Sequence, residues 1–501
     1  FKRGFVWTSR NTNSTSPSAL YTETAPPLPS PPSSLLNNAL YAKTIKDLGD
    51  AIKVETPFDI DAFEAHLVDH PNRAFVASVL KGLREGFWPF DEGEWEAEER
   101  EYKGNFVKED VDVEAIRAFR DKELDAGRWS PPVDVDPGKL PPGMKLSPLF
   151  VVWQKGKARV ITDHSASGIN DGIPRESAKV RYDDMRPFGR ALREARAANG
   201  DRALITFKSD VASAFLNLAA HPLFQIRQAV SIDGVIHIVR RLVFGNRASP
   251  RCWCAVSGLL CWVAIRKFEI ESLHVYMDDF FGIDFDGNVV FYRGKYRPAN
   301  QARLLEFWDA IKCPWEEKKQ EHGQCLQIIG LYVEINRGAV SLSPDAVAAL
   351  VAAIDTFLTS PDRKAPLRVW QRLAGHINWA LNVLPWGRPA LCEVYRKMAG
   401  KSQPIASLFL NREVVEELSW FKEVLGSSLG VSFVTEGCWD DSEADAVFWT
   451  DASLRLGMAF VCNGHGYFYP LEPCPPTVSI DIFFLEMVAI LSAISYVASL
   501  P

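Results

Sequence analysis

The spacing of hydrophobic residues divides the chain into a helical part and a mixed part. Before residue 147, apolar residues recur at helical spacing over residues 74–83, and a charged amphipathic pattern covers residues 113–128. From Ser147 onward, short apolar and β-branched runs alternate with longer helical patterns. Strands mixed with helices predict an α+β fold built on a sheet.

The mixed part contains several predicted strands and helices. Strands are expected at residues 149–153, 158–162, 203–207, 224–230, 235–243, 326–335 and 339–342, and helices at residues 250–268, 302–311 and over much of 344–401. Near the C-terminus, strands are expected at 446–450, 458–461 and 466–469, followed by a helix at 485–497. Turns such as Asp233-Gly234 separate neighbouring strands.

One stretch, residues 273–284, has two adjacent acids. Asp278 and Asp279 lie between two apolar runs that are typical of buried strands. Two adjacent acids fit the tight turn of a hairpin, where both side chains can face a cleft. Because an isolated buried carboxylate is very costly without a cation or metal ion, the stretch predicts a divalent-ion site. The alternative is an ordinary acidic hairpin turn.

A third acid, Asp210, follows the predicted strand 203–207. Phosphoryl transfer to a 3′-hydroxyl uses two metal ions roughly 3.5–4 Å apart, bridged by carboxylates. Carboxylates from different strands that converge on one rim of a sheet meet this need. We therefore expect Asp210, Asp278 and Asp279 to converge on one cleft. Taken alone, Asp210 is weak evidence, because strands often end in Asp.

Several motifs resemble those of reverse transcriptases, and they occur in the order that the family has. Residues 208–215 (KSDVASAF) resemble polymerase motif A, residues 244–250 (FGNRASP) resemble motif B, and residues 276–279 (YMDD) resemble motif C. Residues 329–331 resemble the primer-grip hairpin, Lys318 and Lys319 stand near the motif D lysine, and residues 157–170 are similar to the fingers motif. The matching stretch covers about 200 residues.

The resemblance implies a role for each matching residue. Asp210 and Asp278 would bridge two Mg²⁺ ions, with Mn²⁺ as an alternative. The backbone carbonyl of Val211 would complete one ion site, and Asp279 would be a secondary ligand. The residues implied in nucleotide binding are Lys157 and Arg159 on the triphosphate, Phe215 against the sugar, where it would exclude a 2′-hydroxyl, and Val211, Gly245 and Lys319.

Structural explanations compete with several of these roles. Arg159 is also explained as a solvated charge at a strand edge, Phe215 as a core residue, and the Lys318-Lys319 pair as solvated surface. Phe244 departs from the family, because many retroviral relatives carry Gln there, and direct nucleotide contact at that position is in doubt. His164 and His376 lack ligand-spaced partners in the sequence and are expected to be core or surface residues.

A finer resemblance is to reverse transcriptases of fungal DIRS-type retroelements. It is carried by residues 163–168 (DHSASG), 277–282 (MDDFFG) and 373–379 (LAGHINW). Ty3/Gypsy-like and Pao-like elements are the alternatives. If the resemblance holds, the fold is a right-hand polymerase with fingers, palm and thumb.

The C-terminal third resembles two further parts of such proteins. Residues 344–430 look like a helical thumb and connection, in which a basic face and aromatic residues would grip a nucleic-acid backbone. The residues concerned are Arg363, Lys364, Arg368, Arg372, Arg388, Arg396, Lys397, Trp370, Trp379 and Trp386. Residues 440–501 resemble a truncated RNase H-like α/β domain, with Asp451 and Glu486 as two metal ligands. A complete site needs two more acids, so RNase H activity is not expected.

Composition limits the function classes. The net charge of −7 gives no overall electrostatic footprint for nucleic acid, so binding must come from a local basic groove. The nine cysteines lack zinc-ligand spacing and are expected to be free thiols in a reducing compartment. No apolar run reaches about 18 residues, so no membrane span or membrane partner is expected.

The expected organisation has five parts. They are a disordered Ser/Pro-rich leader (1–40), a helical region leading into the fingers (41–145), reverse transcriptase fingers and palm (146–343), a thumb and connection (344–430), and a partial RNase H-like domain (440–501). The acidic run 91–101 is expected to be solvated. A start at Phe1 and an end at Pro501 suggest cuts in a longer polypeptide.

The predicted function is RNA-directed DNA polymerase activity of a retrotransposable element. Its partners would be an RNA or DNA template–primer and deoxynucleoside triphosphates, in the cytoplasm or nucleus, with the oligomeric state left open. The alternative is a catalytically inactive or domesticated retroelement fragment that binds nucleic acid or protein.

Overall fold

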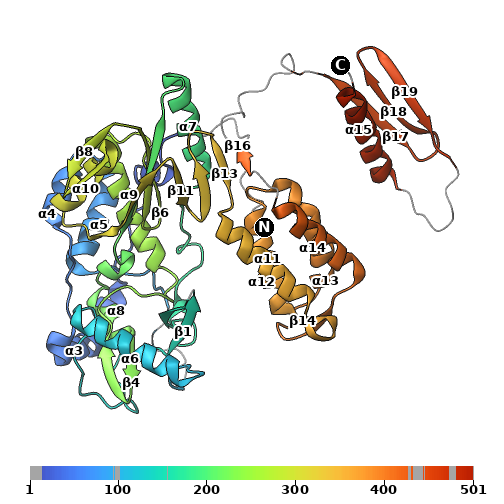
Figure 1. The fold of residues 1–501 in the computed structure, drawn as a ribbon. Coiled ribbons are helices and arrows are strands. Elements are labelled where there is room, and N and C mark those ends of the chain that lie inside the picture. Colours follow the sequence, from blue (N-terminus) through green and yellow to red (C-terminus); the bar gives the residue numbers. More distant parts are fainter. Residues whose placement is uncertain are drawn as a thin grey trace. The chain divides into compact units, whose positions relative to one another are not determined.

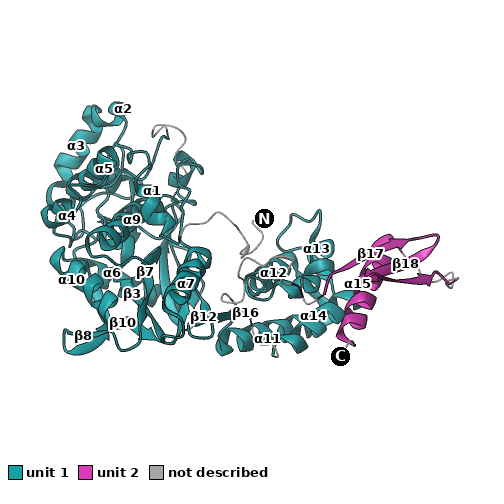
Figure 2. Cartoon of the chain, turned by 90° about the horizontal axis from the view of Figure 1, so that it is seen from above, with its two compact units in different colours: residues 1–434 teal, residues 435–501 magenta. Residues whose placement is uncertain are grey.

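The computed structural model describes residues 14–93, 95, 102–154, 156–426, 430–432, 444, 446–472 and 481–499. The chain forms two compact units, Phe1–Val434 and Thr435–Pro501, which Figure 2 shows in different colours. The first unit contains the predicted acidic cluster, and the second contains the predicted RNase H-like part. The expectation of a mixed helix-and-sheet fold is confirmed.

A four-stranded antiparallel sheet forms the centre of the first unit. Its strand order is β10 (Trp315–Gly323), β3 (Leu204–Val211), β7 (Asp279–Phe285) and β6 (His274–Tyr276). Successive side chains of β3 and β7 point to opposite faces of the sheet, and each face carries apolar side chains of its own. Because β3 runs to Val211, Asp210 lies inside the strand, three residues beyond its predicted end at residue 207.

The two faces of this sheet belong to two different hydrophobic cores. Phe207, Val211 and Phe280 point to one face and pack with α9 (Ser249–Lys267) and α10 (Ala299–Ala310). Leu204, Phe281 and Ile283 point to the other face and pack with α7 (Met185–Asn199). The helix α9 is apolar around most of its circumference, as expected for a helix buried inside a core. Figure 1 shows α9 and α10 beside the sheet.

Smaller elements surround the central sheet. The two-stranded hairpins are β1 (Leu149–Gln154) with β2 (Lys157–Thr162), β4 (Ala229–Ile232) with β5 (Val235–Ile238), and β8 (Val289–Tyr292) with β9 (Lys295–Pro298). The N-terminal helices are α1 (Pro17–Thr22), α2 (Ser33–Leu36), α3 (Ala39–Leu48), α4 (Ile60–His66), α5 (Arg73–Glu85) and α6 (Asp110–Asp125). The helix α6 and the hairpins β1–β2 and β4–β5 share a third, smaller core.

The second core continues into the C-terminal helices of the first unit. It joins α11 (Pro344–Leu358), α12 (Leu367–Ala380), α13 (Cys392–Met398) and α14 (Arg412–Leu425), which Figure 1 shows grouped together. It also includes the sheet of β11 (Cys325–Ile328), β12 (Leu331–Glu334), β13 (Ala339–Ser341) and β16 (Val431–Ser432). A short pair, β14 (Lys364–Pro366) and β15 (Ser407–Phe409), closes this region.

The second unit is a three-stranded antiparallel sheet with one helix. The strand order is β17 (Phe448–Ser453), β18 (Gly457–Cys462) and β19 (His465–Pro470), and α15 (Ile482–Ala498) packs on β17 and β18. Phe460, Cys462 and Ala493 form its small core. The described residues of this unit thus contain the strands and the helix that the sequence predicted.

The prediction of a disordered leader is wrong for residues 14–40. Ala19, Ala25 and Leu28 are buried in the main core, and α1, α2 and the start of α3 are helical. The Ser- and Pro-rich composition supplies a helix cap and a first helical residue, since Ser16 caps α1 and Pro17 begins it. Residues 1–13 lie outside the described part of the chain.

Two other local predictions are wrong, one for the start of the strand 224–230 and one for Asp91 in the acidic run, where Glu92 is exposed as expected. Residues 222–227 form the helix α8 (Pro222–Arg227) and β4 begins only at Ala229, because His221 and Pro222 start a helix before the apolar run. In the acidic run, Asp91 is buried, where it accepts hydrogen bonds from the Gly93 backbone and the Trp95 indole. Residues 94 and 96–101 of that run lie outside the described residues.

Candidate functional site

The acidic turn is a two-residue hairpin between β6 and β7. Tyr276 pairs with Asp279, so Met277 and Asp278 form the turn itself, and Asp279 is the first residue of β7. Met277 has a positive φ of 58°, the arrangement of a type II′ turn, where glycine is usual. The indole of Trp253 on α9 donates to the Met277 carbonyl at 2.9 Å, which fixes this uncommon conformation.

The structure brings the three predicted acids together. Asp210 on β3 lies directly opposite Asp279 on β7 in the antiparallel register, so both side chains point to the same face of the sheet. The backbone N–H of Val211 donates to the carbonyl of Asp278 at 3.0 Å, which ties the turn to the end of β3. Val211 itself is fully buried.

The proximity of the acids changes their protonation. Burial and then the negative charge of Asp278 raise the pKa of Asp279 to about 6. Burial and then the charge of Asp210 raise the pKa of Asp278, while Lys319 and Arg159 act in the opposite direction. Carboxylates this close repel one another, and a cation between them would relieve the repulsion.

Lys319 supplies positive charge at this point. Its ammonium donates to Asp210 Oδ1 at 2.6 Å, and although burial acts to lower the pKa of Lys319, the contact with Asp210 raises it overall. The neighbouring Lys318 pairs with Glu316 at 2.7 Å instead. The strand β10 has a bulge between Trp315 and Gln320, and this irregularity decides which of the two lysines reaches the acids.

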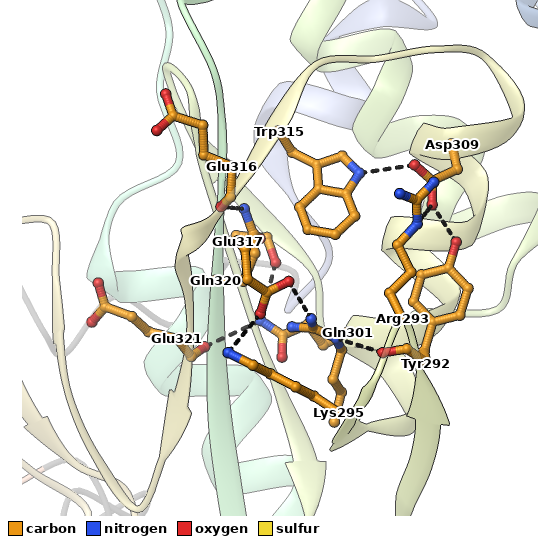
Figure 3. Close-up of polar contacts among 12 residues, drawn as sticks. Tyr292, Arg293, Lys295, Gln301, Asp309, Trp315, Glu316, Glu317, Gln320 and Glu321 are labelled. Atoms are coloured by element: carbon orange, nitrogen blue, oxygen red, sulfur yellow. Dashed lines mark hydrogen bonds and ion pairs between the residues drawn. The ribbon is translucent and has the colours of Figure 1, made fainter.

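A polar network fixes the irregular part of β10, and Figure 3 labels its members apart from Arg297. The guanidinium of Arg297, which is 1% exposed, donates to Glu317 Oε2 at 2.6 Å. The Trp315 indole donates to Asp309 Oδ1 at 3.0 Å, and Gln301 Nε2 donates to the carbonyl of Glu321 at 3.2 Å. The hairpin β8–β9 and the helix α10 thereby hold the strand that carries Lys319.

Sequence reasoning missed this network and one further lysine. Arg297, Asp309 and Glu317 lie in no recognised motif, and their charges looked like ordinary surface charges in the sequence. Lys208 lies in the motif A segment, and its charge opposes the raised pKa of Asp279. Its position two residues before Asp210 on a strand, and therefore on the same face, was the available signal.

The predicted basic pair lies on the hairpin β1–β2. Lys157 and Arg159 are two residues apart on β2, so both point to the same face, and both are exposed. The charge of Arg159 contributes to the pKa of Asp278, which places that guanidinium within electrostatic reach of the acidic turn. Arg159 thus lies close enough to act on Asp278 electrostatically, and Lys157 lies near the tip of the same hairpin.

The loop that contains Gly245 is fastened to β2. Thr162 N–H donates to the Phe244 carbonyl at 3.1 Å, and Asn170 Nδ2 donates to the Gly245 carbonyl at 2.8 Å. Gly245 has a φ of 103°, and a Cβ at this position would lie 1.9 Å from the Thr162 carbonyl oxygen. Only glycine permits this close approach, so backbone packing against Thr162 is sufficient reason for a glycine at position 245.

Phe215 lies in the main core next to Phe244. Phe215 is 4% exposed and Phe244 is 43% exposed, and their rings meet edge to face with centroids 4.6 Å apart. Phe244, rather than Phe215, therefore carries the exposed aromatic surface. Nearby, His164 is buried beside Asn246 Nδ2, and burial lowers the pKa of His164 to about 3, as expected for a core histidine.

The residues expected in the thumb separate into core and surface. Trp370 is fully buried, whereas Trp379 and Trp386 are exposed, and all seven basic residues are exposed except Lys397, which is partly buried. Gly330 lies in the two-residue turn of the hairpin β11–β12, close to Trp379. A Cβ added to Gly330 would lie 3.4 Å from the Trp379 indole. The expected primer-grip turn and the exposed tryptophan are therefore neighbours.

In the second unit the two predicted acids lie on adjacent elements. Asp451 is exposed on β17, and Glu486 on α15 accepts a hydrogen bond from the backbone N–H of Ala452 at 3.3 Å. The helix and strand thus bring Glu486 next to the residue that follows Asp451.

The acids of the first unit suit a hard divalent cation, because carboxylate oxygens are the ligands that Mg²⁺ prefers. The observations that support this fit are the closeness of the acids and the raised pKa values of Asp278 and Asp279. As the side chains stand, with Lys319 on Asp210, the described residues contain no group of three His, Cys, Asp or Glu side chains arranged to hold a metal ion. Among the same residues, no helix combines the length and apolar character needed to cross a membrane.

Comparison with known proteins gives likenesses among solved structures only. No protein-family model matches the chain, and no curated protein matches it. A foamy viral protease-reverse transcriptase in complex with double-stranded DNA has 15% identity and a TM-score of 0.49, with 90% of this chain and 75% of that chain covered.

Two related structures give similar values. A second complex with double-stranded DNA has 16% identity and a TM-score of 0.46, covering 90% of this chain and 89% of that one. A complex with an RNA/DNA hybrid has 14% identity and a TM-score of 0.48, covering 89% and 56%. Likeness at this level establishes no function, so the function must be derived from the residues of the chain itself. The DIRS-type assignment stays a prediction.

The raised pKa of Asp279 predicts a pH-dependent stability. A carboxyl group whose pKa is about 6 in the folded chain and about 4 in the unfolded chain favours folding below pH 4, and this contribution is lost as the pH rises through 6. Without divalent ions, Asp279→Asn should therefore stabilise the first unit by about 1–2 kcal/mol at pH 7.5 and by little at pH 4. Urea denaturation in a chelator at both pH values measures the difference.

The matched control for this experiment is Asp201→Asn, which replaces an exposed acid. It should change the free energy of unfolding equally little at both pH values. A stabilisation by Asp279→Asn that does not depend on pH would contradict the proposed repulsion among the acids.

The contact between Gly245 and Thr162 predicts a large stability cost for a small substitution. Gly245→Ala should destabilise the first unit by about 3 kcal/mol or more, because the added Cβ meets a backbone oxygen and the φ is unfavourable. Gly234→Ala is the control, since Gly234 has a φ of 80° but nothing lies within 4 Å of its added Cβ, and it should cost only about 1 kcal/mol. Equal costs in urea denaturation would refute the tight contact.

Proposed function

We propose that this chain is an RNA-directed DNA polymerase that adds deoxynucleotides to the 3′-hydroxyl of a primer by two-metal nucleotidyl transfer. The observation that carries the proposal is the meeting of Asp210, Asp278 and Asp279 at the end of two paired strands, with two of these acids at raised pKa values. Negative charge concentrated in this way is costly for folding. It is explained if the site serves a cation-dependent reaction.

Each residue has a role that follows from its position. Asp210, Asp278 and Asp279, with the carbonyl of Val211, would hold Mg²⁺ or Mn²⁺, which when bound favours loss of the primer hydroxyl proton and neutralises phosphate charge. The Lys319 ammonium donates to Asp210 and would be free to bind a phosphate oxygen instead if metal ions were bound to the carboxylates.

The nucleotide would lie between the acids and the hairpin β1–β2. Lys157 and Arg159 point to one face of that hairpin, and cationic donors of this kind bind phosphate oxygens strongly. The pair formed by Phe215 and Phe244 would bound the sugar, and Gly245 keeps Phe244 in place through its contact with β2.

Other parts of the chain suit a template–primer. The exposed basic residues of α12 and its neighbours, together with Trp379 beside the β11–β12 turn, suit contact with a nucleic-acid backbone independent of sequence. Asp451 and Glu486 in the second unit would be the remains of an RNase H-like metal site. We assign the chain to a retroelement of DIRS type on its sequence motifs.

A second candidate is a nucleic-acid-binding protein without catalysis. The observation that favours it is the ion pair between Lys319 and Asp210, which engages one of the proposed metal ligands. A primer-extension assay on poly-rA/oligo-dT, with Mg²⁺ and without it, distinguishes the two. Binding without extension would support the second candidate.

The proposed role of Asp278 predicts a loss of activity without a loss of binding. Asp278→Asn should reduce primer extension by about a thousandfold or more, because a bridging ligand for the metal ions is removed. Binding of template–primer in a gel-shift assay should remain within about threefold, since the nucleic acid would be held elsewhere.

Asp286→Asn is the matched control for that substitution. It replaces an exposed acid just beyond the far end of β7 and should leave extension unchanged. Extension by Asp278→Asn at the wild-type rate would overturn the assigned role.

The aromatic pair predicts a change in sugar selection. Phe215→Val should raise incorporation of ribonucleotides relative to deoxynucleotides about tenfold. Without the Phe215 ring beneath it, the Phe244 ring can move away from the sugar, which removes about 1.4 kcal/mol of discrimination. Phe244→Val should have the same effect without the loss of core packing. Competition between the two nucleotide types in primer extension measures the ratio.

Phe188→Val is the control for core packing. Phe188 is fully buried in the second core and should lose stability when shortened, with sugar selection unchanged. If neither Phe215→Val nor Phe244→Val alters the ratio, the pair is core structure only.

A further inference from the structure

Residues 14–28, called the strap here, cross the first unit next to the acidic turn. The helix α1 of the strap packs on α9, the helix whose Trp253 holds the turn. Asn72 Nδ2 donates to the carbonyls of Thr22 and Ala25, and Ser78 Oγ accepts from the N–H of Leu28. The strap is therefore joined to the rest of the first unit by packing and hydrogen bonds along its length.

The first residues of the strap meet the carboxylate of Asp183, which is fully buried. Asp183 Oδ2 accepts from the Ser16 hydroxyl at 2.5 Å, and Oδ1 accepts from the Ser18 N–H at 2.8 Å. The same Oδ2 accepts from the Val275 N–H at 2.8 Å, and the Asp183 N–H donates to the Val275 carbonyl at 3.1 Å. One carboxylate thus links the strap to β6.

A second link joins the strap to β6 one residue earlier. His274 is fully buried, with Nε2 3.0 Å from the Ser14 carbonyl and Nδ1 3.0 Å from the Ser272 carbonyl. The two links therefore come from adjacent residues of β6, and Val275 is three residues before Asp278.

The position of β6 explains why such links matter. It is a three-residue strand at the edge of the sheet, paired on one side with β7. An edge strand this short has few ladder hydrogen bonds of its own, so other contacts must fix its position. Asp183 and the strap supply hydrogen bonds on the side that β7 leaves open.

We propose that Asp183 is a positioning residue for the acidic turn, and that the strap holds Asp183 and β6 in the geometry that places Asp278. The catalytic consequence rests on the proposed polymerase function, whereas the effect on the turn does not. A displacement of about 1 Å at a reacting centre can reduce a rate by up to about a hundredfold, so loss of the links should slow nucleotide addition.

Two variants test the proposal in the full chain. In Asp183→Asn an amide NH₂ replaces one acceptor oxygen, so at least one of the three donors loses its partner. Ser16→Ala removes the hydroxyl bond to Asp183, together with the side-chain cap of α1, and leaves Asp183 itself intact. Asp91→Asn is the matched control, because Asp91 is 1% exposed and also accepts from a backbone N–H and an indole, both at 2.9 Å.

The primary readout is the position of the turn rather than activity. The chain has six methionines, so ¹³C-methyl labelling gives a sparse spectrum in which Met277→Leu identifies the turn signal. Asp183→Asn and Ser16→Ala should both shift the Met277 signal, with the Met398 signal as reference. Asp91→Asn should leave Met277 in place even if it lowers the stability of the chain.

The second readout is kinetic. Asp183→Asn should lower kcat for primer extension about tenfold while the KM for template–primer stays within about twofold, as expected when chemistry and not binding is impaired. A shifted Met277 signal in a chain without any extension activity would support the positioning role and count against the polymerase function. An unchanged Met277 signal in both Asp183→Asn and Ser16→Ala would overturn the proposal.

Discussion

Repulsion among three carboxylates is the constraint on which the first unit depends. Asp210, Asp278 and Asp279 meet because β3 and β7 pair in register, and the raised pKa values of Asp278 and Asp279 indicate that the meeting is unfavourable in the absence of a cation. A fold that keeps such a cluster must hold it from several sides. The sheet, the helix α9, the bulged strand β10 and the strap each provide one part of that support.

The supports differ in chemistry. The Trp253 indole fixes the turn from the main core, and the buried Arg297, which bonds the exposed Glu317, holds β10. At the open edge of the sheet the Asp183 carboxylate joins β6 to the strap, because it accepts from Val275 on β6 and from Ser16 and Ser18 on the strap. Each of these polar contacts has at least one buried partner, and such contacts are specific in geometry because a buried partner left unsatisfied is costly.

The sequence predicted the acids well and their surroundings less well. The strand pattern and the motif order led to Asp210, Asp278 and Asp279, because alternation along strands places carboxylates on a common face. It could not distinguish Lys319 from Lys318, since that choice depends on a bulge in β10. The low-complexity composition of residues 14–40 indicated disorder, because composition does not reveal distant partners such as Asp183 and Asn72.

The sharing of one sheet between two cores has a consequence for modularity. Residue 343 separates the strands of the mixed part from the helices α11 to α14 along the chain, yet Phe281 and Ile283 of the sheet lie in the same core as those helices. The boundary in the sequence is therefore not a boundary in the packing. Recombination or splicing that exchanged everything after residue 343 would have to preserve one face of the central sheet, so the two segments are expected to evolve as a pair.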